Sequence, residues 1–326
     1  MSSPGFVTFI QFFEWNFIDC VRLYATVCLI RLYKNRDDIK VRDDMKKVFQ
    51  YAEYQGLPLD ISYYPAKAQP NTKSRPAIIY FHGGGFIFGQ RDDLPIPYIE
   101  LLTANGYPLV TVDYPLAPEA KLRDIFQALT EFFAWFDLHY ADKLKLFNTD
   151  KILFGRSAGA YLALMWAKRL PVKAVISFYG YYTFFHNHFT EASPYFSKYP
   201  AVPAEHALSI IQAQPMVSST IEARYLLYLY YRQSGSWPKA LLAESENLDA
   251  YSIKVAELAQ LPATFLAASR TDEDVPFFLS KLLDKNIPQT QFIQLDDLPH
   301  DFDRDPNLPT SIPTYRSLLA WLNDLD

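Results

Sequence analysis

The chain has 326 residues, of which 50% are hydrophobic and 21% are charged, and its formal net charge is −5. This composition is typical of a globular protein and excludes an intrinsically disordered chain. It also argues against a nucleic-acid partner, because the sequence has no basic stripe that would replace phosphate counterions. At this length we expect one large domain with an additional lid.

The first segment, residues 6–33, is rich in apolar and aromatic side chains. Glu14, Asp19 and Arg22 interrupt it, so no run reaches the ~18 apolar residues that a membrane span needs. A signal peptide is not expected either, because a basic start and a small-residue cleavage site are both missing. We interpret residues 1–45 as an N-terminal helical cap element, and the alternative is a helix that lies in a membrane interface.

The chain has only two cysteines, Cys20 and Cys28. If both lie on one helix, their separation corresponds to about 12 Å of rise, which is too far for a disulfide bond. We therefore expect a reducing, cytoplasmic location.

Short apolar runs predict a sheet in the rest of the chain. Alternation on either side of Gln55 and Gly56 predicts an antiparallel hairpin over residues 48–64. Beyond it, wholly apolar runs alternate with helical segments, which is typical of a parallel sheet buried on both faces. These runs are residues 77–81, 109–114, 151–154, 174–179, 263–268 and 291–295. The predicted fold class is α/β, with a mostly parallel twisted sheet, an antiparallel edge hairpin and helices on both faces.

More than eighty residues separate the fourth of these runs from the fifth. This segment has no convincing core strand and begins with a dense group of aromatic residues. We predict a helical cap insertion at residues 181–259. Residues 46–180 and 260–326 would then form the main domain.

Glycine is scarce, yet six of the 11 glycines lie in two short stretches. The first stretch, His82-Gly83-Gly84-Gly85-Phe86 with Gly89 after it, directly follows a predicted strand. Uncovered backbone N–H groups in such a loop can point at one spot, as the stabilisation of an oxyanion requires. A phosphate-binding loop is the alternative, but no Lys-Ser/Thr pair follows and the spacing differs from both nucleotide fingerprints.

The second stretch is Gly155-Arg156-Ser157-Ala158-Gly159, between an apolar run and an Ala/Leu-rich segment. This order predicts a strand, a sharp turn and a helix, with the serine presented at the turn. Ser157 is therefore a candidate nucleophile. The alternative is an ordinary turn with a surface serine.

A serine nucleophile needs a base, and the base needs an orienting acid. His300 follows the last predicted strand, so we choose it over His206, which lies in a predicted cap helix. Asp272 and Asp274 both follow the run at residues 263–268. We prefer Asp272 because it is nearer to the strand, and Asp274 remains the alternative.

Other acidic residues flank the candidate base. We expect these residues to be solvated charges that raise the pKa of His300: Asp296, Asp297, Asp301 and Asp303. His186 and His188 are spaced like paired metal ligands, but no cysteine lies near them in the sequence, and we interpret them as part of the cap surface or of a pocket lining. We therefore expect neither a metal nor an organic cofactor.

Three motifs in this order carry a family resemblance: HGGGF at residues 82–86, VDYPLAPE at 112–119 and GRSAG at 155–159. With a later aspartate and a late histidine, they resemble the hormone-sensitive-lipase-like carboxylesterases of the α/β-hydrolase superfamily. The similarity covers the chain from about residue 48 onward. It implies the α/β-hydrolase fold, with capping helices over a catalytic triad of Ser157, Asp272 and His300. It also implies an oxyanion hole made by the N–H groups of Gly84, Gly85 and Ala158.

The chain departs from this family at three places. Arg156 stands where an acidic residue is usual, Pro115 where an arginine is usual, and TDEDVP at 271–276 replaces a DPL-type motif. Because of the last difference, the resemblance does not decide whether Asp272 or Asp274 is the acid of the triad. The sequence offers no explanation for Arg156.

The predicted function is a serine carboxylesterase that acts on short to medium acyl esters. We expect its partner to be a small-molecule ester and not a nucleic acid. Membrane contact would occur only through the N-terminal apolar segment. The sequence leaves a homodimer open. One alternative is an amidase or peptidase with the same triad. Another is a non-catalytic ligand-binding protein, against which the presence of all three triad residues argues.

Overall fold

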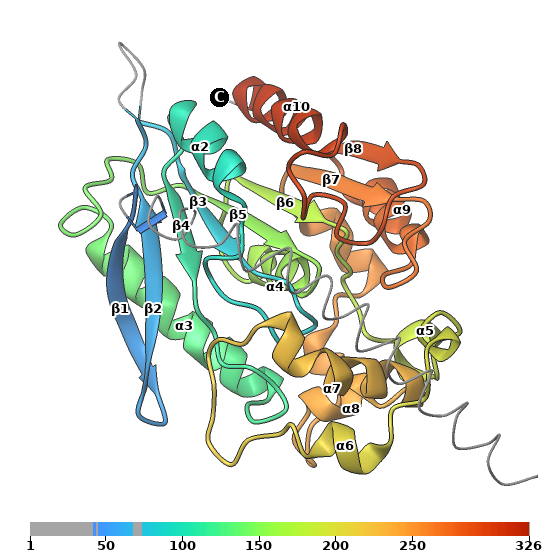
Figure 1. Cartoon of the computed structure of the whole chain (residues 1–326). Coiled ribbons are helices and arrows are strands. Elements are labelled where there is room, and N and C mark those ends of the chain that lie inside the picture. Colours follow the sequence, from blue (N-terminus) through green and yellow to red (C-terminus); the bar gives the residue numbers. More distant parts are fainter. Residues whose placement is uncertain (1–41, 44, 68–73, 326) are drawn as a thin grey trace, which may run out of the picture. The chain divides into compact units, whose positions relative to one another are not determined.

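A computed structural model of the chain describes residues 42–43, 45–67 and 74–325. The chain divides into two compact units, Met1–Lys46 and Lys47–Asp326, and the second contains the sheet (Figure 1). The expected N-terminal helical element and both cysteines lie outside the described residues, apart from residues 42, 43 and 45 of that element. Within the described ranges, no helix is both long enough and apolar enough to cross a membrane.

Eight strands form one sheet in the order β1-β2-β4-β3-β5-β6-β7-β8. β1 pairs with β2 and β2 with β4 in antiparallel fashion, and every other neighbouring pair is parallel. The predicted fold class is confirmed, with small shifts at the strand ends. The strands are β1 (Lys47–Tyr54), β2 (Leu57–Tyr64), β3 (Ala77–Phe81), β4 (Leu109–Val112), β5 (Lys151–Arg156), β6 (Ala174–Phe178), β7 (Thr264–Ser269) and β8 (Thr290–Leu295).

Burial explains why the inner strands are short and apolar. Every residue of β3, β4, β6 and β7 is buried, because helices cover both faces of a parallel sheet. The edge strands β1 and β8 alternate between exposed and partly buried positions. Residues 291–295 were expected to be a strand buried on both faces, but β8 lies at the edge of the sheet and none of its residues is fully buried.

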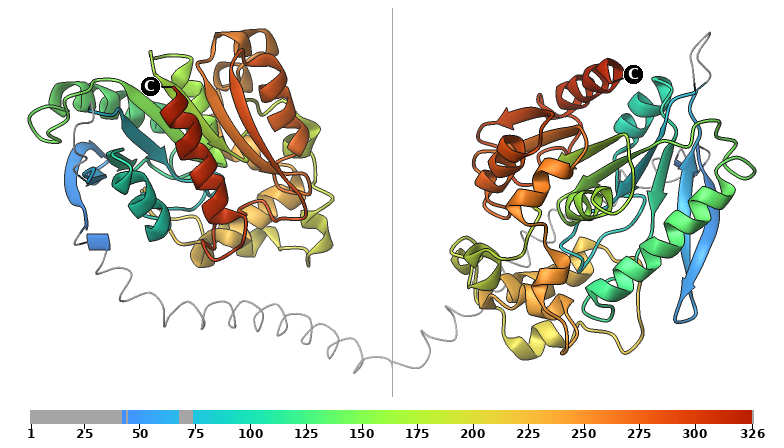
Figure 2. Two further views of the ribbon diagram at one scale, coloured as in Figure 1. Left: turned by 90° about the horizontal axis from the view of Figure 1, so that it is seen from above. Right: turned by 180° about the vertical axis from the view of Figure 1, so that it is seen from behind.

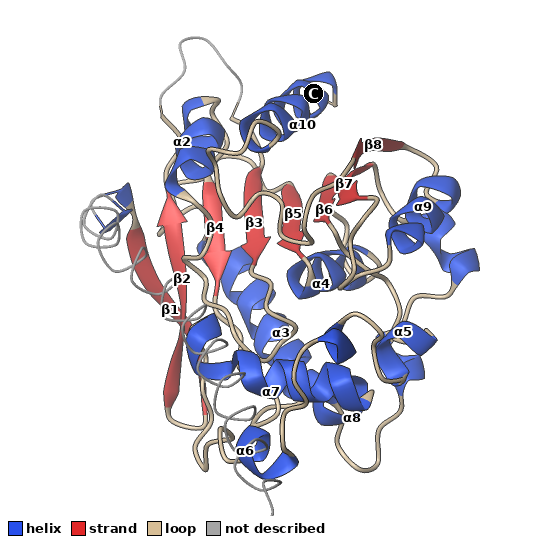
Figure 3. Ribbon diagram, turned by 45° about the vertical axis from the view of Figure 1, so that its right-hand side comes forward, coloured by secondary structure: helices blue, strands red, loops and turns tan. Residues whose placement is uncertain are grey.

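Two layers of helices enclose the sheet. α2 (Ile96–Ala104) and α10 (Ser311–Asp324) lie on one face, and α3 (Leu122–His139) and α4 (Ala158–Ala167) lie on the other (Figure 3). Figure 2 shows the same arrangement from above and from behind. α9 (Phe277–Asn286) packs against β7 and β8. All ten residues of α4 are buried, which accounts for its Ala/Leu-rich sequence.

Residues 181–259, called here the helical insertion, connect β6 to β7 and contain helices but no strand in this fully described stretch. The insertion belongs to the same compact unit as the sheet. Its elements are α5 (Asn187–Thr190), η1 (Phe196–Lys198), α6 (Ala204–Leu208), α7 (Ile221–Ser234), α8 (Trp237–Leu241), η2 (Leu248–Tyr251) and η3, which ends just beyond it (Val255–Gln260).

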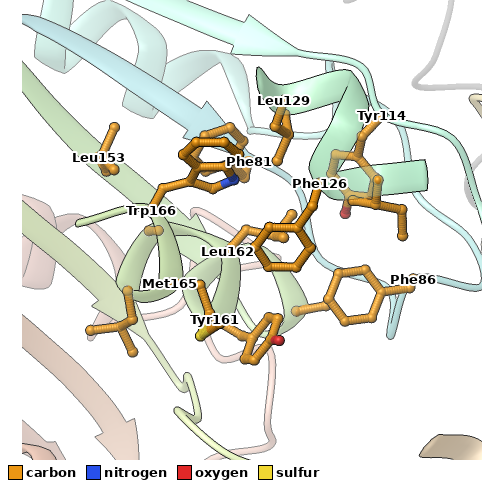
Figure 4. Packing of buried hydrophobic residues seen from close by; sticks show 14 of the residues in the cluster. Phe81, Phe86, Tyr114, Phe126, Leu129, Leu153, Tyr161, Leu162, Met165 and Trp166 are labelled. Atoms are coloured by element: carbon orange, nitrogen blue, oxygen red, sulfur yellow. The ribbon is translucent and has the colours of Figure 1, made fainter. Parts of the chain in front are cut away.

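The core between the sheet, α3 and α4 is strongly aromatic (Figure 4). Phe126 of α3 stacks on Trp166 of α4, with 6.0 Å between ring centroids. Phe86, from the glycine-rich loop after β3, meets Tyr161 of α4 edge to face at 5.8 Å. Phe86 is fully buried, and this burial anchors the glycine-rich loop in the core.

Candidate active site

Ser157 lies at a sharp turn between β5 and α4. Its φ of 55° and ψ of −119° place it in a backbone region that residues other than glycine rarely adopt. Close packing requires the flanking glycines. A Cβ on Gly155 would lie 2.0 Å from the carbonyl carbon of Gly159, and a Cβ on Gly159 would lie 2.0 Å from the carbonyl oxygen of Phe81. The pentapeptide therefore forms the strand, turn and helix that its sequence predicts.

Hydrogen bonds join Ser157 to the two other candidate residues. His300 Nε2 lies 2.9 Å from Ser157 Oγ, and His300 Nδ1 lies 2.7 Å from Asp272 Oδ2. The backbone N–H groups of Asp274 and Val275 donate to the second carboxylate oxygen of Asp272, each at 2.9 Å. A carboxylate fixed in this way favours the imidazole tautomer that carries its proton on Nδ1 and presents Nε2 to the serine.

The pKa of His300 is raised to about 9. Burial by itself would lower this pKa, but the charge of Asp272 and its hydrogen bond outweigh that effect. Asp274 and Asp301 raise the pKa further. The imidazole is therefore a stronger base than a free histidine side chain.

Activity at this site is expected to increase with pH up to about 9. If His300 is the general base that the sequence predicts, it must be neutral in the free enzyme, so kcat/KM for an ester should rise about tenfold per pH unit below the pKa of His300 and level off above it. Measurement of kcat/KM between about pH 6 and pH 10 checks this expectation. A profile that is already flat at neutral pH would contradict it.

Asp274, the alternative acid, has different partners. Its carboxylate forms an ion pair with Arg232 of α7 and accepts the hydroxyl of Tyr228 at 2.7 Å. Burial would raise the pKa of Asp274, but the charge of Arg232 keeps it below its usual value. Asp272, rather than Asp274, is the carboxylate hydrogen-bonded to His300.

The glycine-rich loop passes beside the serine. A Cβ on Gly83 would lie 3.4 Å from Ser157 Cβ. Gly84 and Gly85 have φ values of 94° and 61°, which a glycine adopts without strain. Within the described part of the chain, the backbone N–H groups of Gly84, Gly85 and Ala158 have no hydrogen-bond acceptor. Uncommitted donors beside a serine can stabilise a developing oxyanion.

Buried aromatic residues hold this loop in place. Tyr114 donates its hydroxyl to the carbonyl oxygen of His82 at 2.8 Å and stacks on its imidazole ring, with 4.1 Å between centroids. Trp237 of α8 donates its indole N–H to the carbonyl oxygen of Gly85 at 2.9 Å. Burial lowers the pKa of His82, so this histidine is a neutral structural side chain. The loop is therefore preorganised by its packing.

A family model described as the alpha/beta hydrolase fold matches residues 78–302, which is more than half of the chain. The chain belongs to the α/β-hydrolase family. The resemblance to the hormone-sensitive-lipase-like esterases, which this family includes, is confirmed.

The relatives of this α/β-hydrolase include an enzyme of known activity. The acetyl esterase from Salmonella paratyphi B is 33% identical over 122 residues, which make up 35% of this chain and 37% of the esterase. The chain spans well under half of the length of the curated relatives it matches.

Two solved structures share its fold over most of their length. A protein with unknown function from Staphylococcus aureus subsp. aureus Mu50 is 31% identical, with a TM-score of 0.77, and the match covers 86% of this chain and 99% of that one. An alpha/beta hydrolase superfamily protein from Enterococcus faecalis is 32% identical, with a TM-score of 0.73, and the match covers 86% and 98%.

Helix α7 of the α/β-hydrolase presents one side to the loops around Ser157. Arg224, Tyr228 and Arg232 are spaced four residues apart, so they share one face of the helix. All three are buried. Sequence reasoning missed these residues, because two arginines in a helix are typical of a solvated face.

Each of the three residues contacts a different loop. Arg224 Nη1 and Nη2 bind the two carboxylate oxygens of Glu119, in the loop after β4, at 3.0 and 2.8 Å. The ring of Tyr228 packs on the glycine-rich loop so closely that a Cβ on Gly85 would lie 2.5 Å from it. Arg232 binds the loop after β7 through its ion pair with Asp274. α7 therefore holds together three loops from the carboxyl end of the sheet.

Loss of the Arg224–Glu119 pair is expected to destabilise the fold. Arg224→Met should lower the free energy of unfolding by about 3–5 kcal/mol, because it leaves a buried carboxylate unpaired. Adding Glu119→Gln to Arg224→Met should recover part of this loss. Denaturant unfolding followed by circular dichroism measures both, and an equal loss in the single and double variants would contradict the expectation.

The other histidines have structural partners or lie in solvent. His206 is exposed on α6. His186 Nδ1 accepts the backbone N–H of His188, and His188 Nε2 lies 3.0 Å from the backbone oxygen of Asp274. Among the residues that the structure describes, no group of three or more His, Cys, Asp or Glu side chains could hold a metal ion.

The structure gives Arg156 a partner. Its Nη2 donates to Asp303 Oδ1 at 3.0 Å. The expectation that Asp303 is a solvated charge is wrong, because its side chain is 0% exposed and is neutralised by this arginine. The two residues lie 147 positions apart, so no local sequence pattern could indicate the pair. Asp296 and Asp297 are exposed, as expected.

Proposed function

We propose that this α/β-hydrolase is a serine carboxylesterase that cleaves short to medium acyl esters through an acyl-enzyme intermediate. The observation that carries the proposal is the chain of hydrogen bonds from Asp272 through His300 to Ser157. The relation to an acetyl esterase, at 33% identity, supports an ester with a short acyl group.

In the acylation step, Ser157 Oγ attacks the ester carbonyl while His300 Nε2 takes its proton. Asp272 stabilises the resulting imidazolium through the hydrogen bond at Nδ1. The negative charge on the carbonyl oxygen is met by the N–H groups of Gly84, Gly85 and Ala158, each worth about 3 kcal/mol in the transition state. The intermediate then collapses, and His300 returns the proton to the departing alcohol.

In the deacylation step, a water molecule replaces the alcohol. His300 takes a proton from this water, whose oxygen attacks the acyl group on Ser157. The carboxylic acid leaves, and the proton returns to Ser157 Oγ. Neither step requires a metal or an organic cofactor. In this proposal the helical insertion acts as the cap over the site.

A fluorophosphonate probe tests the nucleophile directly. We expect the purified protein to form one covalent adduct, located at Ser157 by mass spectrometry. A non-catalytic binding protein would not react. Matched p-nitrophenyl esters of increasing acyl length would then report acyl preference, and a matched ester and anilide would separate an esterase from an amidase. Faster anilide turnover would overturn the proposed substrate class.

A further inference from the structure

We propose that Arg156, Tyr179 and Asp303, called here the Arg156 cluster, are positioning residues that hold His300 against Ser157. This inference rests on the proposed esterase function for its kinetic readout. None of the three residues is part of the hydrogen-bond chain itself. They would act through His300 and through the turn that carries Ser157.

Three buried hydrogen bonds join the members of the cluster in a ring. Arg156 Nε donates to the hydroxyl oxygen of Tyr179 at 2.7 Å, and Arg156 Nη2 donates to Asp303 Oδ1 at 3.0 Å. Tyr179 completes the set by donating its hydroxyl to the same Asp303 oxygen at 2.6 Å. The exposed fractions of Arg156, Tyr179 and Asp303 are 6%, 2% and 0%. Buried, charge-assisted hydrogen bonds of this kind restrict side-chain motion strongly.

The cluster is connected to both partners of the Ser157–His300 hydrogen bond. Arg156 directly precedes Ser157, and Asp303 follows His300 by three residues. The ring of Tyr179 also contacts the His300 imidazole, with centroids 4.6 Å apart and an interplanar angle of 61°. The hydroxyl of Tyr179 is therefore held by the ion pair of Arg156 and Asp303, and its ring packs against the imidazole of His300.

Asp303 is anchored from the opposite side as well. Tyr315 of α10 donates its hydroxyl to Asp303 Oδ2 at 2.7 Å, and Tyr98 of α2 donates to the Asp303 carbonyl oxygen at 2.9 Å. These bonds fix the segment that follows His300 to the helices on one face of the sheet. Arg156 connects the same segment to the end of β5.

Tight positioning matters because proton transfer depends on the serine–histidine geometry. A displacement of roughly 1 Å of a reacting group can lower a rate by about 100-fold. A cluster that served only stability would affect unfolding and leave kcat unchanged. The two roles therefore give different experimental results.

Two single-atom changes separate these roles. Tyr179→Phe removes the hydroxyl that binds Arg156 and Asp303 and keeps the ring that contacts His300. Tyr51→Phe removes a buried hydroxyl on the edge strand β1, which donates to the carbonyl oxygen of Asp113 at 2.7 Å. Tyr179→Phe loses two buried hydrogen bonds and Tyr51→Phe loses one, so we expect a decrease in Tm for both and the larger decrease for Tyr179→Phe. For Tyr179→Phe we expect kcat to fall by about 10-fold or more with KM within about threefold. For Tyr51→Phe we expect kcat to stay within about threefold of wild type.

A spectroscopic readout makes the test independent of ester hydrolysis. The His300 Nδ1 proton, shared with Asp272, should give a downfield proton NMR signal that shifts in Tyr179→Phe and stays unchanged in Tyr51→Phe. If the wild type cleaves no ester, the proposed function fails, and this signal alone decides the positioning role. Equal kcat values and unshifted signals in the two variants would overturn the positioning role.

Discussion

Ser157→Ala is expected to lower kcat for a p-nitrophenyl ester by about 10⁴-fold or more, because the proposed mechanism forms the acyl-enzyme on the hydroxyl of Ser157. Binding should survive, since the glycine-rich loop and the helical insertion do not depend on the serine hydroxyl. The residual rate would come from the N–H donors of Gly84, Gly85 and Ala158. Steady-state kinetics on purified protein, with active-site titration of the wild type, measures the change.

Ser209→Ala is the matched control for the serine variant. Ser209 is exposed at the end of α6, and its hydroxyl donates only to the carbonyl oxygen of His206. Its loss should leave both turnover and fluorophosphonate labelling intact. Activity of Ser157→Ala within about tenfold of wild type would show that another residue is the nucleophile.

Asp272→Asn is expected to lower kcat by about 10⁴-fold, because an amide does not favour the tautomer in which Nε2 accepts the serine proton. Asp274→Asn is the comparison, since it changes a carboxylate two residues away. For Asp274→Asn we expect less than a tenfold change in kcat. It should cost about 3–5 kcal/mol in the free energy of unfolding, because Arg232 loses its buried partner.

Both variants should shift the pH profile to lower pH, and Asp272→Asn should shift it further, because Asp272 raises the pKa of His300 more than Asp274 does. Asp274 raises the pKa of His300 by its charge, so Asp274→Asn should move the rising limb of kcat/KM to lower pH. Kinetics across the pH range and denaturant unfolding give both measurements. A larger loss of kcat in Asp274→Asn than in Asp272→Asn would transfer the role of orienting acid to Asp274.

The sheet was predictable because its strands have a distinct pattern. Strands buried on both faces must be short and apolar throughout, and β3 and β6 show this pattern without interruption. The turn at Ser157 was predictable for a steric reason, since Gly155 and Gly159 occupy positions where a Cβ would collide with backbone. The site residues Ser157, His300 and Asp272 follow strands of one sheet, and the structure brings them within hydrogen-bonding distance.

Long-range pairings could not be predicted in the same way. Asp272 and Asp274 both follow β7, and only the position of Arg232, on a helix earlier in the chain, shows that Asp274 is already paired. Arg156 and Asp303 form a similar long-range pair, because the sequence offers no explanation for Arg156 and Asp303 looks like a solvated charge in its own segment. Charged residues that pair across the fold leave no periodic signal in the sequence.

The face of α7 formed by Arg224, Tyr228 and Arg232 also constrains how substrate can enter. Two buried ion pairs and a tyrosine packed on the glycine-rich loop would have to separate before α7 could swing away. That rearrangement would expose unpaired charges and disturb the loop that carries the N–H donors. Access to Ser157 would therefore depend on side-chain and loop movements around a stationary α7, and inactivation by heat should coincide with unfolding of the sheet.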